Sequence, residues 1–89
     1  MTIPFGSVKP ALILPTMTLC PDSKVIHSYG YDEETKALFI RFVHGRKLYS
    51  YANFPADMHH SMREAVSAGK YFGQHIVKNY EGHYIKEAE

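Results

Sequence analysis

The chain has 89 residues, which is the size of one small domain. Hydrophobic residues make up 45% of it and charged residues 21%, so the composition is that of a folded protein and excludes disorder throughout. The net charge of +1 excludes a protein that binds nucleic acid by bulk charge alone. The single cysteine, Cys20, excludes an intrachain disulfide and a zinc site built on two thiolates.

Residues 1–22 contain four of the five prolines, at near-regular spacing: Pro4, Pro10, Pro15 and Pro21. Proline interrupts helices and removes strand donors, so we predict an extended N-terminal arm. Its apolar middle, residues 11–14, can lie along a sheet edge of its own chain or of a neighbouring subunit, which would make the protein a homo-oligomer. The alternative is a loosely docked leader, and the pattern leaves both open.

The longest apolar segment, residues 11–20, is too short for a membrane helix and contains Pro15. It also lacks the basic start and the cleavage site of a signal peptide. We therefore expect neither membrane insertion nor secretion, and a cytoplasmic protein.

Three segments rich in β-branched and aromatic residues predict strands: 24–32, 37–44 and 48–54. Polar residues 32–36 form the first turn between them, and Gly45 with Arg46 forms the second. The middle segment alternates apolar and polar residues at period two, with Leu38, Ile40 and Phe42 on one face. These segments predict a three-stranded antiparallel meander.

The second turn decides which way two tyrosines point. A two-residue turn at 45–46 pairs Phe42 with Tyr49 and Ile40 with Tyr51, which places both phenols on the face of the aliphatic residues. A one-residue change in loop length would invert that arrangement.

Two helices follow the third strand. Pro55 suits the first turn of a helix, with Asn53 or Phe54 as the cap and Asp57 near its positive end. The predicted core-facing stripe of this helix is Met58, Met62, Ala65 and Val66. Ser67 caps a second helix that extends to about residue 80 and has a core face of Phe72, Ile76 and Tyr80. The predicted fold is therefore α+β, with a three-stranded meander, two helices packed on one face and an extended N-terminal arm.

Three motifs occur in order with short gaps. They are Ser23, Ile26, Gly30, Tyr31 and Asp32; then Tyr49, Tyr51 and Pro55; then Ser67, Gly69, Tyr71, Phe72, Ile76 and Tyr80. This pattern resembles the KTSC domain, named from the C-terminal region of some lysyl-tRNA synthetases and found also as small free-standing bacterial and phage proteins. The resemblance divides the chain into an arm (1–22), a KTSC-like domain (23–80) and a C-terminal tail (81–89). It implies no assigned catalytic activity and a proposed role in RNA binding.

The chain departs from that family pattern in two places. The loop between Phe42 and Tyr49 is one residue longer than is usual for the family, and the arm has no counterpart in it. Any role of the arm therefore lies outside the resemblance.

Charge is unevenly placed along the chain. Between residues 35 and 80 there are seven basic and two acidic residues, a net charge of +5. Within the hairpin, tyrosines can stack bases while cations neutralise phosphates, and the candidate ligand-binding residues there are Arg41, Arg46, Lys47, Tyr49 and Tyr51. The alternative is that the two tyrosines belong to the core. In that case a stacking face would use the opposite side of the sheet, with Phe39 and Arg41, and with Tyr29 or Tyr31.

The start of the second helix is another candidate anion site. Free N–H groups at a helix start, together with a nearby ammonium, suit a phosphate or a carboxylate, and Ser67, Gly69 and Lys70 provide them. An aromatic and basic stripe continues from there with Tyr71, His75 and Lys78. The alternative is an ordinary helix cap followed by a turn glycine, because SxGK lacks the longer glycine pattern of a phosphate loop.

The six histidines do not predict a metal site, because His59 and His60 are adjacent and diverge on a helix. No serine lies in a nucleophile motif, so we predict no enzyme and no cofactor. The leading interpretation is a non-enzymatic binding module for RNA or another phosphate-bearing nucleotide ligand. The alternative is a protein-interaction or self-assembling module, for example a small phage factor that binds a host protein or sequesters a small ligand between subunits.

Overall fold

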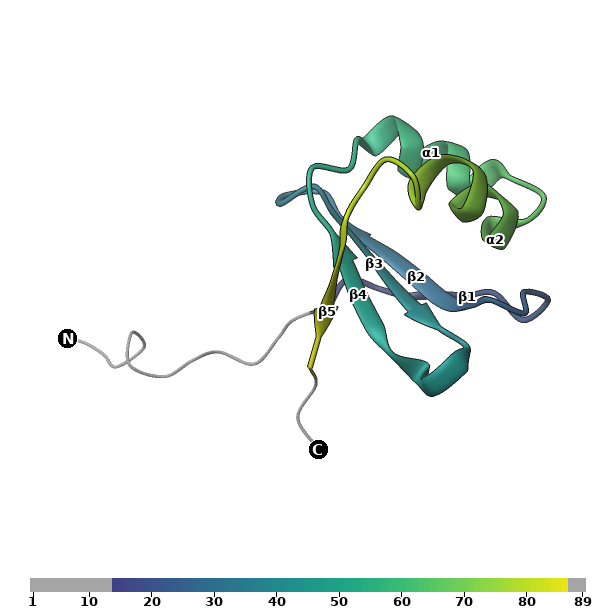
Figure 1. Ribbon diagram of the computed structural model, residues 1–89. Coiled ribbons are helices and arrows are strands. Elements are labelled where there is room, and N and C mark those ends of the chain that lie inside the picture. Colours follow the sequence, from purple (N-terminus) through teal and green to yellow (C-terminus); the bar gives the residue numbers. More distant parts are fainter. Residues whose placement is uncertain (1–13, 87–89) are drawn as a thin grey trace.

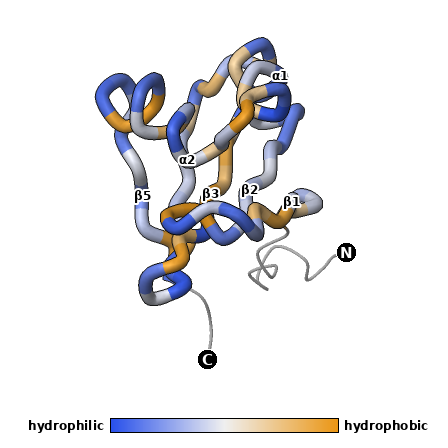
Figure 2. Tube along the Cα trace, turned by 90° about the vertical axis from the view of Figure 1, so that its right-hand side faces the viewer, coloured by the Kyte–Doolittle hydropathy of each residue, from blue (hydrophilic) through white to orange (hydrophobic). Residues whose placement is uncertain are grey.

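The structure is a computed structural model that describes residues 14–86. Within this range the chain forms one antiparallel sheet whose five strands lie side by side in chain order. The strands are β1 (Thr18–Leu19), β2 (Ile26–Asp32), β3 (Ala37–Phe42), β4 (Leu48–Tyr51) and β5 (Gly82–Ile85). Figure 1 shows the sheet below a helical layer, and Figure 2 shows β1 and β5 at opposite edges of it.

The helical segments lie after β3 and between β4 and β5. They are the short 3-10 turn η2 (His44–Arg46), α1 (Ala56–Glu64), α2 (Ala68–Tyr71) and the π-helical turn η3 (Phe72–Ile76), which continues α2 directly. The second helix therefore runs from Ala68 to Ile76, shorter than the predicted end near residue 80. Both α1 and α2 cover the same face of the sheet, as predicted (Figure 1).

The prediction of three strands is wrong, because the described residues contain five. The two additional strands lie in segments that were predicted as an arm and a tail. Thr18 and Leu19 pair with β2, and residues 82–85 pair with β4 along their whole length. Neither segment has enough residues for a periodic pattern, so only pairing with the neighbouring strand makes them strands. The predicted edge location of the arm's residues 11–13 lies outside the described residues.

The β3–β4 hairpin has a different register from the predicted one. Ile40 pairs with Tyr49 and Leu38 with Tyr51, because the turn spans residues 43–46 rather than two residues. The shift is two residues, so the predicted partners are wrong while the predicted face of both tyrosines is right. The longer turn contains two residues in the left-handed region, Gly45 at φ 74° and Arg46 at φ 52°.

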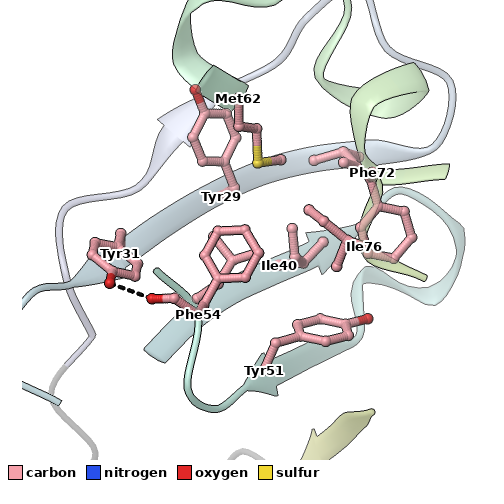
Figure 3. Packing of buried hydrophobic residues seen from close by; sticks show 10 residues of the cluster. Tyr29, Tyr31, Ile40, Tyr51, Phe54, Met62, Phe72 and Ile76 are labelled. Carbon is pink, nitrogen blue, oxygen red and sulfur yellow. Dashed lines mark hydrogen bonds between the residues drawn. The ribbon is translucent and has the colours of Figure 1, made fainter. Parts of the chain in front are cut away.

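The core lies between the sheet and the helices. It contains aromatic and aliphatic side chains of β2, β3, β4, α1 and the second helix: Ile26, Tyr29, Tyr31, Leu38, Ile40, Tyr51, Phe54, Met62, Phe72 and Ile76. Figure 3 shows Phe72 and Ile76 lying over Ile40, and the Tyr31 hydroxyl donating to the Phe54 carbonyl. Burying one such aliphatic side chain contributes about 1.5 to 3 kcal/mol. Leu38 and Ile40 are thus interior as predicted, and Phe42, Met58 and Tyr80 pack against this core.

Two predicted core residues, Ala65 and Val66, are neither in the core nor packed against it. Val66 is fully exposed, because α1 ends at Glu64 and Ala65 has an extended backbone. The helical stripe that predicted its burial therefore stops before Val66. The predicted cap of the next helix is confirmed, since the Ser67 Oγ accepts a hydrogen bond of 3.2 Å from the Lys70 N–H.

The segment before β1 crosses the sheet on the face away from the helices. A methyl group at Gly30 would lie 2.7 Å from the Met17 sulfur and 2.8 Å from the Thr16 carbonyl oxygen. Only glycine leaves room for a chain at that distance. Residues 15–17 are therefore packed against the back of β2.

Candidate functional site

A largely apolar groove lies at one end of the sheet. β2 begins there, and the β3–β4 hairpin turns there, since Ile26 pairs with Phe42 and Arg41 with Leu48. The second helix forms the opposite wall. The groove has a volume of about 510 Å³ and is lined by Lys24, Val25, Phe42, His44, Lys47, Tyr49, Tyr51, Phe72 and Val77. We call it the hairpin groove.

Four aromatic rings line the hairpin groove. Phe42 is central, with its ring centroid 5.5 Å from that of Tyr49 and 5.5 Å from that of Phe72, both edge to face. Tyr51 meets Phe72 edge to face at 5.8 Å. Edge-to-face packing stabilises such clusters by about 0.5 to 1.5 kcal/mol per pair, so the rings support one another's positions. The result is a preformed aromatic surface at the open end of the core.

A fifth ring extends this surface onto β5. Tyr84 lies opposite Tyr49 in the sheet, with ring centroids 5.5 Å apart, and 55% of it is exposed. The Lys47 ammonium lies 5.9 Å from the centre of the Tyr84 ring, within the range of a cation–π contact. This contact holds an ammonium group beside the aromatic surface.

The charged residues that line the hairpin groove are basic. Lys24, just before β2, and Lys47, just before β4, contribute two ammonium groups, and His44 contributes an imidazole. Neither aspartate nor glutamate is among the lining residues. The groove therefore combines an apolar, aromatic floor with a cationic rim, an environment that favours a planar ligand with an attached anion.

Tyr51 is the most buried of the groove tyrosines. Burial, with a smaller contribution from the neighbouring Tyr49 phenol, raises the pKa of Tyr51 to about 12. The Tyr51 hydroxyl therefore remains protonated at physiological pH and can donate a hydrogen bond. The position of Tyr51 also explains why residue 82 is a glycine, because a methyl group there would lie 2.8 to 2.9 Å from the tyrosine ring and hydroxyl.

The second helix changes its geometry beside the groove. The Val77 N–H donates to the Phe72 carbonyl at 3.1 Å, which is the five-residue spacing of a π-helical turn. Such turns are often found at functional sites. Here the turn places Phe72 inward and Val77, 54% exposed, at the rim of the hairpin groove.

The predicted hairpin residues divide into two sets. Lys47, Tyr49 and Tyr51 come together in the hairpin groove. Arg41 lies on the other face of the sheet, opposite Leu48, and its guanidinium donates to the Arg46 carbonyl at 3.0 Å. Arg46 is exposed and does not line the groove. It lies in the hairpin turn with a left-handed backbone conformation.

The predicted residues of the second helix lie around a separate, smaller hollow. Ser67, Lys70 and Tyr71 line a volume of about 240 Å³ that shares no lining residue with the hairpin groove. Further along, the Tyr71 and His75 rings lie 4.5 Å apart, so the predicted aromatic and basic stripe exists. Lys78 is exposed and follows the helix.

Gly69 has a packing role at the start of that helix. A methyl group there would lie 3.0 Å from the Ser23 Oγ, which itself accepts hydrogen bonds from the Val25 and Ile26 N–H groups. This contact joins the start of the second helix to the start of β2. It supports the ordinary cap that the sequence left open as an alternative.

Phe39 and Arg41 lie on the opposite face of the sheet, as predicted, but the assignment of Tyr29 or Tyr31 to that face is wrong. Tyr29 pairs with Ile40 and Tyr31 with Leu38, so both tyrosines point toward the helices and are buried. Phe39 does lie on the opposite face, but it is 8% exposed. Strand alternation places Tyr29 and Tyr31 away from Phe39 and Arg41.

The sequence interpretation missed several residues of the hairpin groove. Phe42 and Phe72 were assigned only to the core. Lys24 lies before residues 35–80, over which the excess of basic residues was counted, and Tyr84 lies in the predicted tail. No local signal identified Tyr84, because the four residues 82–85 are too few to show a period-two pattern. Among residues 14–86, no three His, Cys, Asp or Glu side chains are close enough to hold a metal ion. None of the helices in that range has the length and hydrophobicity that a bilayer crossing requires.

The five-stranded sheet, its helical layer and the groove define a small α+β domain with an aromatic, cation-rimmed hollow. The KTSC domain family model matches residues 22–80, and the chain belongs to that family. A KTSC domain protein from Yersinia pestis has a similar crystal structure, with a TM-score of 0.73 and 28% sequence identity. The similarity covers 80% of this chain and 97% of that one. Among curated proteins, no sequence matches this chain.

Proposed function

We propose that this protein is a non-enzymatic, cytoplasmic binding module for RNA or another phosphate-bearing nucleotide ligand, with the hairpin groove as its binding site. The observation that carries the proposal is the combination of aromatic rings and ammonium groups around one hollow. Phe42 and Tyr49 provide the aromatic floor, and Lys24 and Lys47 provide cations at the rim. The proposal agrees with the RNA-binding role that the family resemblance implies.

Nucleotide chemistry fits this arrangement better than other ligand classes. Stacking of a base on an aromatic side chain contributes about 1 to 3 kcal/mol, and it works with every base because each has a π-face. Ammonium groups at the rim attract phosphate. A cationic ligand is disfavoured because no carboxylate lines the groove, and a purely aliphatic ligand would leave the lysines unused.

A titration with a short RNA, a single-stranded DNA and free nucleotides at rising salt tests this function. We expect binding that is strongest at low salt, because phosphate contacts release counterions. Tyrosine fluorescence reports it directly, since the chain has seven tyrosines and no tryptophan. Absence of binding at low salt, or binding that is indifferent to salt, would contradict the proposal.

Paired charge variants locate the site. The double variant Lys24→Gln and Lys47→Gln removes both ammonium groups of the hairpin groove, whereas Lys70→Gln removes an exposed one beside the smaller hollow. We expect the double variant to lose affinity and Lys70→Gln to retain it. The reverse result would assign binding to the start of the second helix.

The second candidate function is a protein-interaction or self-assembling module. It is favoured by the positions of β1 and β5, which are the edge strands of the sheet within residues 14–86, and by the exposed Leu19 on β1. Open strand edges pair readily with other chains. The mass in solution of the full chain and of a chain lacking residues 1–13 tests this candidate. A monomeric mass for both would remove the arm and the edges from consideration as assembly elements.

A further inference from the structure

The hairpin groove is bounded on three sides. The start of β2 closes one side with Lys24 and Val25, the hairpin turn closes the second with His44 and Lys47, and the second helix closes the third with Val77. Its volume of about 510 Å³ lies within the range of about 300 to 1,000 Å³ typical of small-molecule sites. An open hollow of this size, walled on three sides, can hold a compact ligand.

Two of the other predicted cations, Arg41 and Lys70, lie away from the hairpin groove. Arg41 lies on the far face of the sheet, where it donates to the Arg46 carbonyl. Lys70 lies beside the second hollow, and the two hollows have no lining residue in common. Modules that follow a single strand contact about 4 to 16 nucleotides through a continuous basic groove. The two hollows are therefore separate sites and do not form one continuous groove.

The rim of the hairpin groove also contains exposed apolar side chains. Val25 is 50% exposed and Val77 is 54% exposed, and both line the groove beside the aromatic floor. A base or a nucleoside lying on Phe42 and Tyr49 would cover them. A phosphate chain would not, because it places charged oxygens rather than apolar surface against the protein.

We infer that the hairpin groove takes one nucleotide, either free or at the end of a strand, with its base on the aromatic floor and its phosphate at Lys24 and Lys47. The inference rests on the proposed function and narrows its ligand class. Nucleotides beyond the first add little, because the other aromatic and cationic pair, Tyr71 with Lys70, lines a separate hollow that shares no lining residue with the hairpin groove. Affinity is therefore set by a single nucleotide unit.

Length dependence of binding tests this inference. Dissociation constants are measured for adenosine monophosphate, a dinucleotide and an octanucleotide RNA at 50 mM and 200 mM salt, conditions over which phosphate-rich contacts weaken markedly. We expect the three dissociation constants to agree within about threefold, and the octanucleotide to show a salt slope of about −0.7, as for one phosphate contact on a single strand. Adenosine monophosphate should displace the labelled octanucleotide completely.

The outcomes separate this inference from the proposed function. An octanucleotide that binds more than about 30-fold tighter than the mononucleotide, with a slope steeper than about −3, would overturn the inference and leave RNA binding intact. Failure of all three ligands to bind would defeat the proposed function and this inference together. Binding of all three ligands with similar affinity supports both.

A matched pair of valine variants places the ligand. Val77→Glu puts a carboxylate at the rim of the hairpin groove, and Val66→Glu puts one on a fully exposed valine beside the smaller hollow. Both side chains are exposed enough for the fold to tolerate the change. We expect Val77→Glu to weaken mononucleotide binding at least about tenfold by repelling phosphate, and Val66→Glu to leave it unchanged. Equal binding by both variants would remove the nucleotide from the groove.

Discussion

The ring of Tyr51 lies directly against the backbone of Gly82, so that a methyl group at position 82 would come within 2.8 Å of a ring carbon. This contact joins β4 to β5 and positions one of the tyrosines that line the hairpin groove. β5 thus holds Tyr51 in position in the candidate site, although the residues of β5 lie outside the family match at 22–80.

Replacing Gly82 with alanine should therefore destabilise the protein. Tyr51 is 5% exposed and packs against Phe72, so its ring cannot move away without disturbing the core. We expect a loss of about 1 to 3 kcal/mol in the free energy of unfolding, the usual cost of overpacking. Urea denaturation measures it.

Gly73→Ala is the matched control for that substitution. A methyl group at Gly73 meets nothing within 4 Å, and alanine favours helix by up to about 1 kcal/mol over glycine. This variant should be as stable as the parent or more so. Equal losses in both variants would show that the Tyr51 contact does not determine the effect.

Gly30→Ala should release the segment before β1. The added methyl group would lie 2.8 Å from the Thr16 carbonyl oxygen, which is a backbone atom and cannot rotate away. The Cys20 N–H donates to the His27 carbonyl at 2.9 Å beside this contact. We expect faster hydrogen exchange of the Cys20 amide and a stability loss of about 1 to 3 kcal/mol. Unchanged exchange in a stably folded variant would show that residues 15–17 do not pack there in solution.

Stability should fall in mild acid because of His59. Its ring stacks on Tyr31 at 4.7 Å and meets Tyr29 edge-on at 6.1 Å. Burial lowers the pKa of His59, Arg63 and His60 lower it further, and Glu33 opposes them. The unfolded chain therefore protonates His59 at higher pH than the folded chain does. The stability that the neutral His59 ring contributes is fully present above the ordinary histidine pKa, and it is lost as the pH falls through the pKa of His59 in the folded state.

Urea midpoints between about pH 7.5 and pH 5 measure this dependence, because the ordinary histidine pKa of about 6.5 lies in that window. His59→Gln should flatten the decline. His60→Gln, at the exposed neighbouring position, should keep it. If the decline persists in His59→Gln and vanishes in His60→Gln, the assignment to His59 is wrong.

Ser67→Ala should remove the cap of the second helix. The Lys70 N–H loses its acceptor, and loss of an N-cap costs about 1 kcal/mol, within a range of 0.5 to 2. Thermal or urea unfolding measures the loss. Ser61→Ala, on the exposed side of α1, is the control and should change stability by a few tenths of a kcal/mol at most. A neutral Ser67→Ala would show that water caps the helix equally well.

Part of the candidate site was predictable from the sequence. Lys47, Tyr49 and Tyr51 were named because the hairpin segment combines cations with alternating aromatics, and the groove contains all three. The second helix was expected to share this ligand surface through Lys70 and Tyr71. It does not, because those two side chains line a different hollow. Periodicity predicts which face of a strand or helix a residue occupies. Which residues line the same hollow depends on where the ends of several elements lie relative to one another.

The sequence by itself determined the elements whose signals are local. Alternation at Leu38 and Ile40 defined a buried strand, Pro55 marked the start of α1, and Ser67 marked the start of the second helix. Period-two and period-3.6 patterns arise from the geometry of each element alone, so a short window of sequence contains them.

Only the tertiary structure decided the edges of the sheet and the outline of the groove. Residues 82–85 become a strand because β4 offers an unpaired edge, and residues 15–17 lie across Gly30 because no side chain blocks them. The groove brings Lys24 beside Lys47 and Phe72 through contacts between distant parts of the chain. Such contacts depend on which surfaces remain available after the local elements have packed, and a local pattern does not specify them.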